Sequence, residues 1–278
     1  MKESTKNLAR QVFTAVVPMG IQRRARPYAR FALSLAERTI THPFSDKPVA
    51  VELETNSNCT RSCFYCPRLD EDYVLETEVF ESVVDQLAEW GFRGRFSPHS
   101  YNEPLTDERL PALIKYASQK LPKSDIVLYT NGDLLTGEMT ERLIESGVDN
   151  IIVSLHDPAS PELEGRLNAL NSQYSAIRFI DRRAGKRDIA FVNRGGLVNL
   201  GEIEPMPYCS FIDTMVIRAD GNVILCCSDT QKQHVFGNVN HESVKDIWEE
   251  PEFKALRKDI RAGRYDLPIC QECGYEIL

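Results

Sequence analysis

The sequence lacks several features that would each indicate a class of protein. Its longest apolar run near the start, VFTAVVPMGI, is broken by Pro18 and Gly20 and is too short to span a bilayer. It has no excess of positive charge, because 33 Lys and Arg oppose 41 Asp and Glu and leave a formal charge of −8. A surface that binds nucleic acid is normally basic, so the charge argues against that partner. What remains is a chain of 278 residues, long enough for one large α/β domain with a small appendage.

A convincing secretory signal is also missing. Glu3 lies where a positively charged segment would stand, and QRRAR follows the apolar run where small residues would mark a cleavage site. In a secreted protein the eight cysteines would suggest disulfides, but here they cluster at spacings typical of metal ligands. The sequence therefore predicts thiolate ligation of a metal in a reducing cytoplasm, with no membrane contact.

The hydrophobic pattern divides the chain into three parts. Residues 1–46 predict a helical extension whose arginines form either a solvated face or a contact for an acidic partner. Residues 47–200 alternate between strands and helices, and residues 201–278 predict a small α+β domain with a hairpin at 214–227 and a helix at 243–263. In the middle part we expect strands at 49–54, 95–100, 125–130, 150–155, 176–181 and 188–193, and helices at 78–90, 107–121, 136–146 and 161–170. Thr77 is the expected cap of the first of these helices.

Strand–helix alternation of this kind builds a parallel sheet with right-handed crossovers. Six units are too few to close an eightfold barrel, so the fold class is α/β, with a partial (β/α)6 TIM-like barrel. Active sites in such sheets gather at the C-terminal ends of the strands. The residues that end the strands are therefore the candidates for function.

Three cysteines in the stretch CTRSCFYCP, Cys59, Cys63 and Cys66, have no fourth cysteine nearby. A structural zinc site uses four ligands, so zinc would need a distant residue to complete it. A cubane four-iron four-sulfur cluster has four iron corners, and three thiolates leave one corner open to another ligand. The loop follows the first expected strand, which places such a cluster at the strand ends.

This C-x3-C-x2-C loop after the first strand of an α/β barrel resembles the radical S-adenosylmethionine (SAM) superfamily over residues 49–200. The resemblance implies that the open iron chelates the amino and carboxylate groups of SAM. An electron from an external reductant of the flavodoxin or ferredoxin type then leads to a 5′-deoxyadenosyl radical, which abstracts hydrogen from the substrate. The cofactor carries this chemistry and the protein positions it.

Motif positions in the resemblance imply further contacts to SAM. Tyr65 matches the aromatic residue that packs on the adenine. The stretch Tyr101-Asn102-Glu103-Pro104 stands where the family has Gly-Gly-Glu-Pro, so it departs in its first two residues and keeps the glutamate. Polar residues at later strand ends either contact SAM or substrate or only satisfy the backbone. The expected cofactor-binding residues are Tyr65, Tyr101, Asn102, Glu103, Asn131, Ser154 and Asn193.

Four more cysteines, Cys209, Cys226, Cys270 and Cys273, form a second set. On spacing alone a zinc knuckle is the commoner answer. With Gly221 five residues before Cys226, the pattern resembles the auxiliary-cluster domain called SPASM in its truncated twitch form. That resemblance implies one auxiliary 4Fe-4S cluster closed by four thiolates, which takes an electron from the substrate radical.

The leading hypothesis is an oxidoreductase that acts on a small polar molecule, a sugar or cyclitol, as in the twitch family that includes 2-deoxy-scyllo-inosamine dehydrogenase. The candidate substrate contacts, one of which would orient or deprotonate the reacting hydroxyl, are His99, Tyr129, His156 and Arg194. Cys227 is either a small buried side chain or a hydrogen-atom donor, and in the second case the enzyme is an epimerase. Modification of a ribosomal peptide and a non-catalytic zinc protein that binds a partner are the remaining alternatives.

Overall fold

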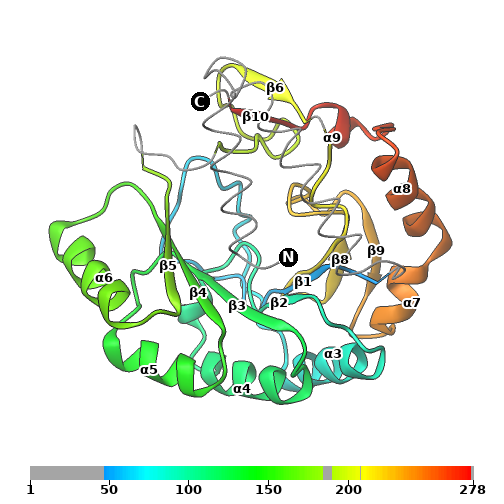
Figure 1. Ribbon diagram of the computed structural model, residues 1–278. Helices are drawn as coiled ribbons and strands as arrows, with labels where there is room; N and C mark the ends of the chain where they lie inside the picture. Colours follow the sequence, from blue (N-terminus) through cyan, green and yellow to red (C-terminus); the bar gives the residue numbers. More distant parts are fainter. Residues whose placement is uncertain (1–46, 184–189, 207, 277–278) are drawn as a thin grey trace, which may run out of the picture.

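The computed structural model describes residues 47–183, 190–206 and 208–276. The helical extension predicted for residues 1–46 lies outside the described residues. The described chain forms one eight-stranded sheet and a separate two-stranded sheet, with helices along the outer side of the larger sheet (Figure 1). In the part of the chain that the structure describes, no helix is long and apolar enough to cross a membrane.

Five parallel strands form one half of the large sheet, in the order β5-β4-β3-β2-β1. They are β1 (Ala50–Leu53), β2 (Arg95–Ser97), β3 (Asp125–Thr130), β4 (Asn150–Leu155) and β5 (Ile177–Asp181). The crossovers between them are α3 (Thr77–Glu89), α4 (Leu110–Lys120), α5 (Gly137–Glu145) and α6 (Pro161–Gln173). The prediction of an α/β partial barrel is therefore confirmed.

The helix starts follow the local chemistry, with one correction. Ser160 caps α6 through a hydroxyl that accepts from Leu163 N, and Thr136 caps α5 in the same way. The predicted cap Thr77 is instead the first residue of α3, because Glu76 holds the extended cap conformation. Glu76 makes no side-chain hydrogen bond to the helix, so this start depends on tertiary packing.

The sixth parallel strand is not the one predicted. Among the described residues of 188–193 there is no strand, and Val192 makes a single antiparallel bridge to Tyr275. The sixth parallel strand is β7 (Thr214–Ile217), which pairs with β1 at the opposite edge. Strands β8 (Asn222–Ile224) and β9 (Val235–Asn238) continue the sheet in antiparallel fashion. The predicted hairpin at 214–227 is thus present, and it belongs to the barrel sheet.

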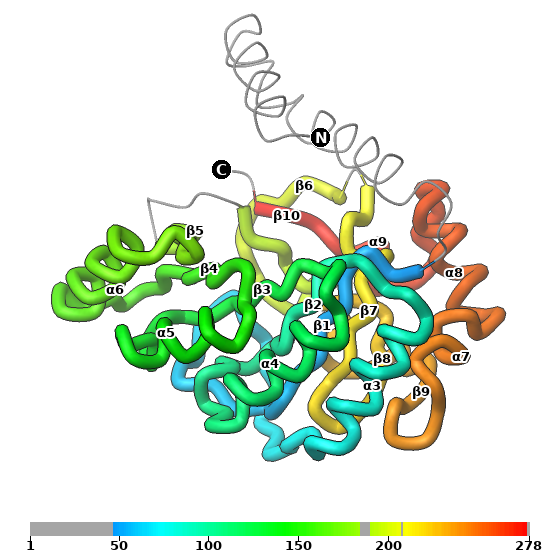
Figure 2. The backbone as a smooth tube through the Cα atoms, turned by 60° about the horizontal axis from the view of Figure 1, so that its bottom comes forward, coloured from blue at the N-terminus to red at the C-terminus, as the bar shows by residue number. Residues whose placement is uncertain are grey.

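The remaining elements lie around this end of the sheet, with the first helices after β9 beside that strand and the two-stranded sheet at the top of the view (Figure 2). They are α7 (Val244–Glu249), α8 (Pro251–Arg261), α9 (Pro268–Gln271) and the antiparallel pair of β6 (Ile203–Pro205) with β10 (Gly274–Glu276). The prediction of a single helix at 243–263 is wrong. Pro251 interrupts it, because proline has no backbone N–H to donate and its ring clashes with the preceding turn of a helix. Glu250 starts a new helix there, and its carboxylate accepts from Glu252 N and Phe253 N.

Alternation along the strands separates a packed face from a polar face. Val51 and Leu53 of β1 belong to the hydrophobic core under the helices. The residues between and after them, Glu52 and Glu54, point to the opposite, inner face. Because the inner face carries charged and polar side chains at the strand ends, it is the place where a polar ligand can be held.

Candidate functional site

The first cysteine set lies in the loop that follows β1. Cys59, Cys63 and Cys66 are free, half-buried thiols, and the N–H of Cys66 donates to the carbonyl of Cys63 at 3.0 Å. Burial raises the pKa of the Cys59 and Cys66 thiols, and the neighbouring Cys63 raises both further. Soft thiolates crowded together in this way need a compensating cation, so the donor set fits an iron–sulfur cluster.

The second strand-end segment is locked to the same loop. Glu103 is buried, and burial raises its pKa although hydrogen bonds oppose the shift. Its carboxylate accepts from Thr130 Oγ1 at 2.6 Å and from the N–H of Asn131 at 2.6 Å. Asn131 then donates from Nδ2 to Thr60 Oγ1 at 2.9 Å, and the same nitrogen lies 4.0 Å from Cys59 Sγ. The structure therefore brings Glu103 and Asn131 to the cysteine loop, where SAM is expected.

Tyr101 and Asn102 present polar atoms that the described protein leaves unpaired. Both side chains are buried, and Tyr101 Oη and Asn102 Nδ2 have no hydrogen-bond partner among the described residues. The other end of the Asn102 amide is used, because Oδ1 accepts from the N–H of Ser100 at 3.1 Å. Buried polar atoms normally find partners, so these two are suited to a ligand.

Tyr65 lies in an aromatic group at the mouth of the barrel. Its ring stacks on Phe191 with the centroids 3.9 Å apart, and its hydroxyl hydrogen-bonds Nδ1 of His156. The guanidinium of Arg182 lies 5.8 Å from the Phe191 centroid. One face of Tyr65 is thus already covered by protein, so an adenine contact would have to use another part of the side chain. The predicted cofactor contact Ser154 lies in β4, opposite Ile180 of β5.

The side chain of Asn193 is hydrogen-bonded within the protein, and its predicted contact to SAM stays a prediction. Its amide nitrogen donates to the carbonyl of Glu272 at 2.8 Å, and its Oδ1 accepts from the N–H of Gly274 at 2.8 Å. The backbone N–H of Asn193 also donates to the carbonyl of Gly274 at 2.9 Å. Because both ends of the amide hold the loop around Cys273, Asn193 has little left to offer a ligand.

The second cysteine set comes together from three parts of the C-terminal region. Cys209 precedes β7, Cys226 follows β8, and Cys270 and Cys273 flank the end of α9. Burial raises the pKa of each thiol, and that of Cys270 reaches about 12. Cys209 and Cys273 each raise the pKa of Cys226 and of Cys270 through electrostatic repulsion between the thiolate forms. Four thiols that the fold brings into one region supply the donor set of an auxiliary iron–sulfur cluster. In the described ranges no three His, Cys, Asp or Glu side chains gather as the ligands of a single metal ion do.

Arg194 contacts the backbone of Cys227, next to Cys226, and its charge also lowers the pKa of Cys66 in the first set. Nη1 of Arg194 donates to the backbone carbonyl of Cys227 at 3.0 Å, and the guanidinium lies 5.6 Å from the centroid of Tyr101. Burial acts to lower the pKa of Arg194, but Tyr101, Cys227 and Cys66 hold it above the usual range, so the side chain stays charged. Burial raises the pKa of the Cys227 thiol to about 12, so this thiol stays protonated at neutral pH.

Both histidines on the inner face are uncharged at neutral pH. Burial lowers the pKa of His99 and of His156 to about 4, with Arg61 adding to the effect at His156. His99 stacks on Tyr129 at 4.7 Å between centroids, and its Nδ1 has no hydrogen-bond partner among the described residues. Nδ1 of His156 is engaged with Tyr65, whereas Nδ1 of His99 has no such partner in the described structure.

Sequence reasoning missed several residues of the inner face. Glu52 accepts from Arg95 Nη2 at 2.9 Å, and the Arg95 guanidinium lies 5.4 Å from the centroid of Tyr129. Alternation within β1 and β2 was the available signal, because it places both side chains on the face opposite the core. The missed residues with a place at the site are Glu52, Glu54, Arg95, Arg182, Phe191 and Arg218.

An open cavity of about 440 Å³ lies beside the first cysteine loop, on its outer side. Arg61, Asp133 and Arg166 line it, together with the start of α6. Arg61 pairs with Asp133 at 2.6 Å, and Arg166 donates to the Asp133 carbonyl at 2.7 Å. These contacts tie the loop to the ends of β3 and β4, so the cavity borders the site without containing the strand-end polar residues.

Two family models match this chain. The radical SAM superfamily matches residues 53–187, and SPASM, an iron–sulfur cluster-binding domain, matches residues 209–274. The chain belongs to the radical SAM superfamily. This radical SAM enzyme uses SAM and iron–sulfur clusters, and the alternative of a non-catalytic zinc protein is wrong.

One relative of known activity covers most of this chain, and a second covers about half of it. The S-adenosyl-L-methionine-dependent 2-deoxy-scyllo-inosamine dehydrogenase of Niallia circulans is 28% identical over 233 residues, which are 81% of this chain and 92% of the relative. The crystal structure of BtrN in complex with AdoMet and 2-DOIA matches with a TM-score of 0.74 and 28% identity, over 81% of this chain and 92% of that one. The PqqA peptide cyclase of Granulibacter bethesdensis is 30% identical over 143 residues, only 37% of its length and 49% of this chain.

Proposed function

We propose that this radical SAM enzyme is a dehydrogenase that oxidises a carbinol carbon of a small polyhydroxylated ring, a cyclitol or sugar. The similarity to a cyclitol dehydrogenase over 92% of that relative supports the proposal. The observation that carries it is the buried, charged Arg194 beside the segment of Cys226, on an inner face rich in hydrogen-bonding groups. A polyhydroxylated ring can use such groups, whereas an apolar substrate would leave them unpaired.

Each cofactor has a ligand set in this chain. We assign the SAM-binding cluster to Cys59, Cys63 and Cys66, and the auxiliary cluster to Cys209, Cys226, Cys270 and Cys273. When bound, SAM and its cluster supply the abstraction of a hydrogen atom, and the auxiliary cluster accepts one electron. SAM itself would be held by Tyr101 and Asn102, whose buried polar atoms are unpaired in the described structure, and by Asn131, which donates to Thr60 of the first cysteine loop.

Arg194 orients the reacting hydroxyl in this proposal. Its guanidinium stays charged, so it donates hydrogen bonds and does not accept the proton. The Nε of Arg194 is buried and has no partner among the described residues, which leaves one donor for substrate. His99 is the candidate acceptor of the hydroxyl proton, because its imidazole is neutral and its Nδ1 is unpaired in the described structure.

A second candidate function is supported by Cys227. A hydrogen-atom donor must carry an S–H bond, and a thiol with a pKa of about 12 is protonated at neutral pH. Cys227 lies next to Arg194, which the dehydrogenase proposal places at the reacting carbon. If the thiol returns a hydrogen atom to that carbon, the enzyme is an epimerase and no net oxidation occurs. Peptide modification remains a third possibility, on the partial similarity to the peptide cyclase.

We further propose an external one-electron reductant of the flavodoxin or ferredoxin type and a location in the cytoplasm. The eight cysteines of the chain are all free thiols in the structure, as a reducing compartment requires. We propose the reductant because the SAM-binding cluster must be reduced before each new hydrogen abstraction. We keep the predicted domain boundaries at 46/47 and 200/201 as a division by ligand sets, although β7, after the second boundary, pairs with β1 in the barrel sheet.

The test is a product screen with the anaerobically reconstituted enzyme, SAM and dithionite. Candidate sugars, cyclitols such as 2-deoxy-scyllo-inosamine, and peptides are scored by 5′-deoxyadenosine formation and product mass. A product lighter by two hydrogens supports the dehydrogenase, and unchanged mass with deuterium uptake from solvent supports the epimerase. Cys63→Ala is the control, which should abolish 5′-deoxyadenosine formation. If only peptides are modified, the cyclitol or sugar proposal is rejected.

A further inference from the structure

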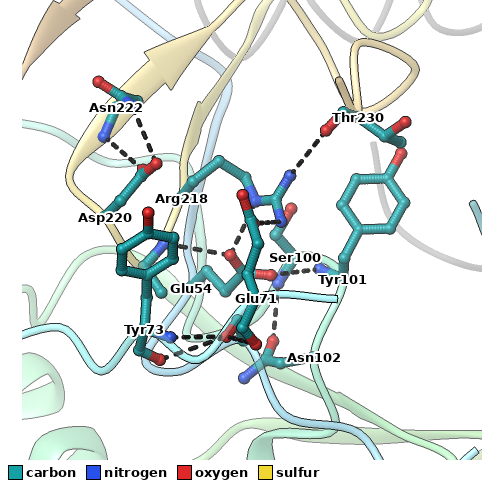
Figure 3. Close-up of polar contacts among 12 residues, drawn as sticks. Glu54, Glu71, Tyr73, Ser100, Tyr101, Asn102, Arg218, Asp220, Asn222 and Thr230 are labelled. Atoms are coloured by element: carbon teal, nitrogen blue, oxygen red, sulfur yellow. Dashed lines mark hydrogen bonds and ion pairs between the residues drawn. The ribbon is translucent and has the colours of Figure 1, made fainter. Parts of the chain in front are cut away.

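A fully buried ion pair joins the ends of two neighbouring parallel strands. Glu54 follows β1 and Arg218 follows β7, and Arg218 Nε donates to Glu54 Oε2 at 2.7 Å (Figure 3). The two side chains are 1% and 2% exposed. Removing both charges from water carries a penalty of several kcal/mol per ion, so such a pair is a poor source of stability. Its value is better sought in the geometry that it imposes.

The Glu54 carboxylate also holds two backbone segments. Oε1 accepts from the N–H of Tyr101 at 2.9 Å, and Oε2 accepts from the N–H of Ala219 at 3.1 Å. Tyr101 opens the segment that stands where the superfamily binds SAM. Ala219 begins the turn of the β7–β8 hairpin, which ends at Cys226. One carboxylate therefore connects the SAM side of the site to the auxiliary side.

Tyr101 continues this connection through its ring. The guanidinium of Arg218 lies 5.0 Å from the ring centroid, and that of Arg194 lies 5.6 Å from the same centroid. Arg194 in turn donates to the carbonyl of Cys227, beside the ligand Cys226. The contacts thus run without interruption from Glu54 through two arginines to the residues that hold the auxiliary set.

A second arm leads back to the first cysteine loop. Glu71, five residues after Cys66, lies 3.6 Å from Arg218 Nη2. Glu71 also accepts from Lys232 Nζ at 2.6 Å, and the same nitrogen lies 2.5 Å from Asp220 in the hairpin turn. Figure 3 shows Glu71 and Glu54 together beside the guanidinium of Arg218. The same network therefore touches the segment after the triplet, the SAM-side segment and the hairpin.

We propose that Glu54 and Arg218 are positioning residues that couple SAM binding at the first cysteine loop to the geometry of the β7–β8 hairpin and its cysteines. A displacement of the Tyr101 backbone on SAM binding changes its bond to Glu54, and Arg218 passes the change to β7. The proposal rests on SAM binding by the superfamily, and it is independent of the substrate class proposed above.

Hydrogen exchange of the reconstituted holoenzyme, with and without SAM and without any substrate, tests the coupling. In the wild type, SAM should slow amide exchange at residues 100–106 and also at residues 214–228. In Arg218→Met, protection at 100–106 should remain, while protection at 214–228 should fall at least threefold. Because this variant leaves Glu54 buried without a counterion, the double variant Glu54→Gln with Arg218→Met provides the same test without an unpaired charge.

Arg257 offers a matched control, because it is equally buried but lies in α8. Its guanidinium lies 3.8 Å from the centroid of Trp248 and donates to the carbonyl of the same residue at 2.6 Å. Arg257→Met should keep SAM-dependent protection of the hairpin. The coupling is overturned if SAM does not protect the hairpin in the wild type, or if that protection persists in the double variant. It is also overturned if Arg257→Met loses the protection to the same extent. These results would not contradict the proposed oxidation. Conversely, a failed product screen would not contradict the hydrogen-exchange results.

Discussion

Arg194 donates from Nη1 to the backbone carbonyl of Cys227 at 3.0 Å, so this cation lies beside the segment that carries Cys226. The charge lowers the pKa of Cys66 on one side and that of Cys227 on the other, in each case against a larger effect of burial. The acceptor of this hydrogen bond is the backbone carbonyl of Cys227, so the bond does not involve the thiol. Arg194 itself has φ 54°, an unusual value for a residue with a side chain.

Cys227→Ala separates the two redox outcomes. If the enzyme is a dehydrogenase, the variant should keep its iron content and oxidise substrate at a rate within about threefold of the wild type, because Cys227 is not an assigned ligand. Cys226→Ala is the control, and it should reduce bound iron from about eight to about four per chain. Iron analysis and product mass check both variants. Loss of all turnover in Cys227→Ala, with iron retained, would support the epimerase instead.

Asn193→Ala should loosen the loop that carries Cys273. The variant loses two side-chain hydrogen bonds to Glu272 and Gly274, and it leaves buried backbone groups without partners. We expect the free energy of unfolding to fall by about 1–3 kcal/mol and auxiliary iron to be lost faster on dialysis. Asn199→Ala is the comparison, because that exposed side chain accepts one local bond from Gly201 N. Equal behaviour of the two variants in urea unfolding would contradict the assigned role.

Gly195→Ala should destabilise the protein, whereas Gly165→Ala should not. Gly195 has φ 62°, and an added Cβ would lie 2.3 Å from Ile269 Cγ1, against α9. The left-handed backbone alone costs an alanine about 1–2 kcal/mol. Gly165 lies within α6 with nothing near its Cβ position, so alanine there should stabilise the helix by about 0.5–1 kcal/mol. Thermal unfolding of both variants and the wild type shows whether the two melting temperatures change in opposite directions.

The stability of the fold should depend on pH through His99. Burial lowers its folded pKa to about 4, below the usual value of 6.5, so the unfolded chain binds the proton first as the pH falls. The contribution of neutral His99 is therefore complete above pH 6.5 and is lost as the pH falls toward 4. Relative to wild type, His99→Gln should reduce the loss of stability between pH 7 and pH 5 by about 1–2 kcal/mol. His241 is exposed, and His241→Gln should leave the loss of stability unchanged. Urea unfolding midpoints at pH 7 and pH 5 measure this loss for each variant.

Much of the fold follows from local sequence patterns. Strands β3 and β4 have the predicted bounds, 125–130 and 150–155, because apolar runs flanked by turn residues are strong local signals. The prediction failed at 188–193, where the apolar pattern is real but its partner is Tyr275, near the other end of the chain. It also failed at Pro251, although the proline that breaks the helix was visible in the sequence.

The site shows the same division between local and distant information. Close spacing on one loop picked out Cys59, Cys63 and Cys66, whereas the second set, spread over residues 209–273, was grouped by its resemblance to the SPASM pattern. Glu54 and Arg218 are 164 residues apart, and only the parallel pairing of β1 with β7 brings them together. The role of Asn193 was missed for a similar reason, since its partners lie about 80 residues later in the chain.

Strand β7 completes the row of parallel strands, and this limits how the chain can be divided. A truncated chain that stops before residue 214 would leave the backbone of Ala50–Leu53 unpaired along one side. An unpaired, largely apolar edge of that kind is a template for joining strands of other molecules, so such a fragment should aggregate. Grafting the cluster-binding tail of a relative onto this barrel would therefore have to carry a matching strand, not only matching cysteines.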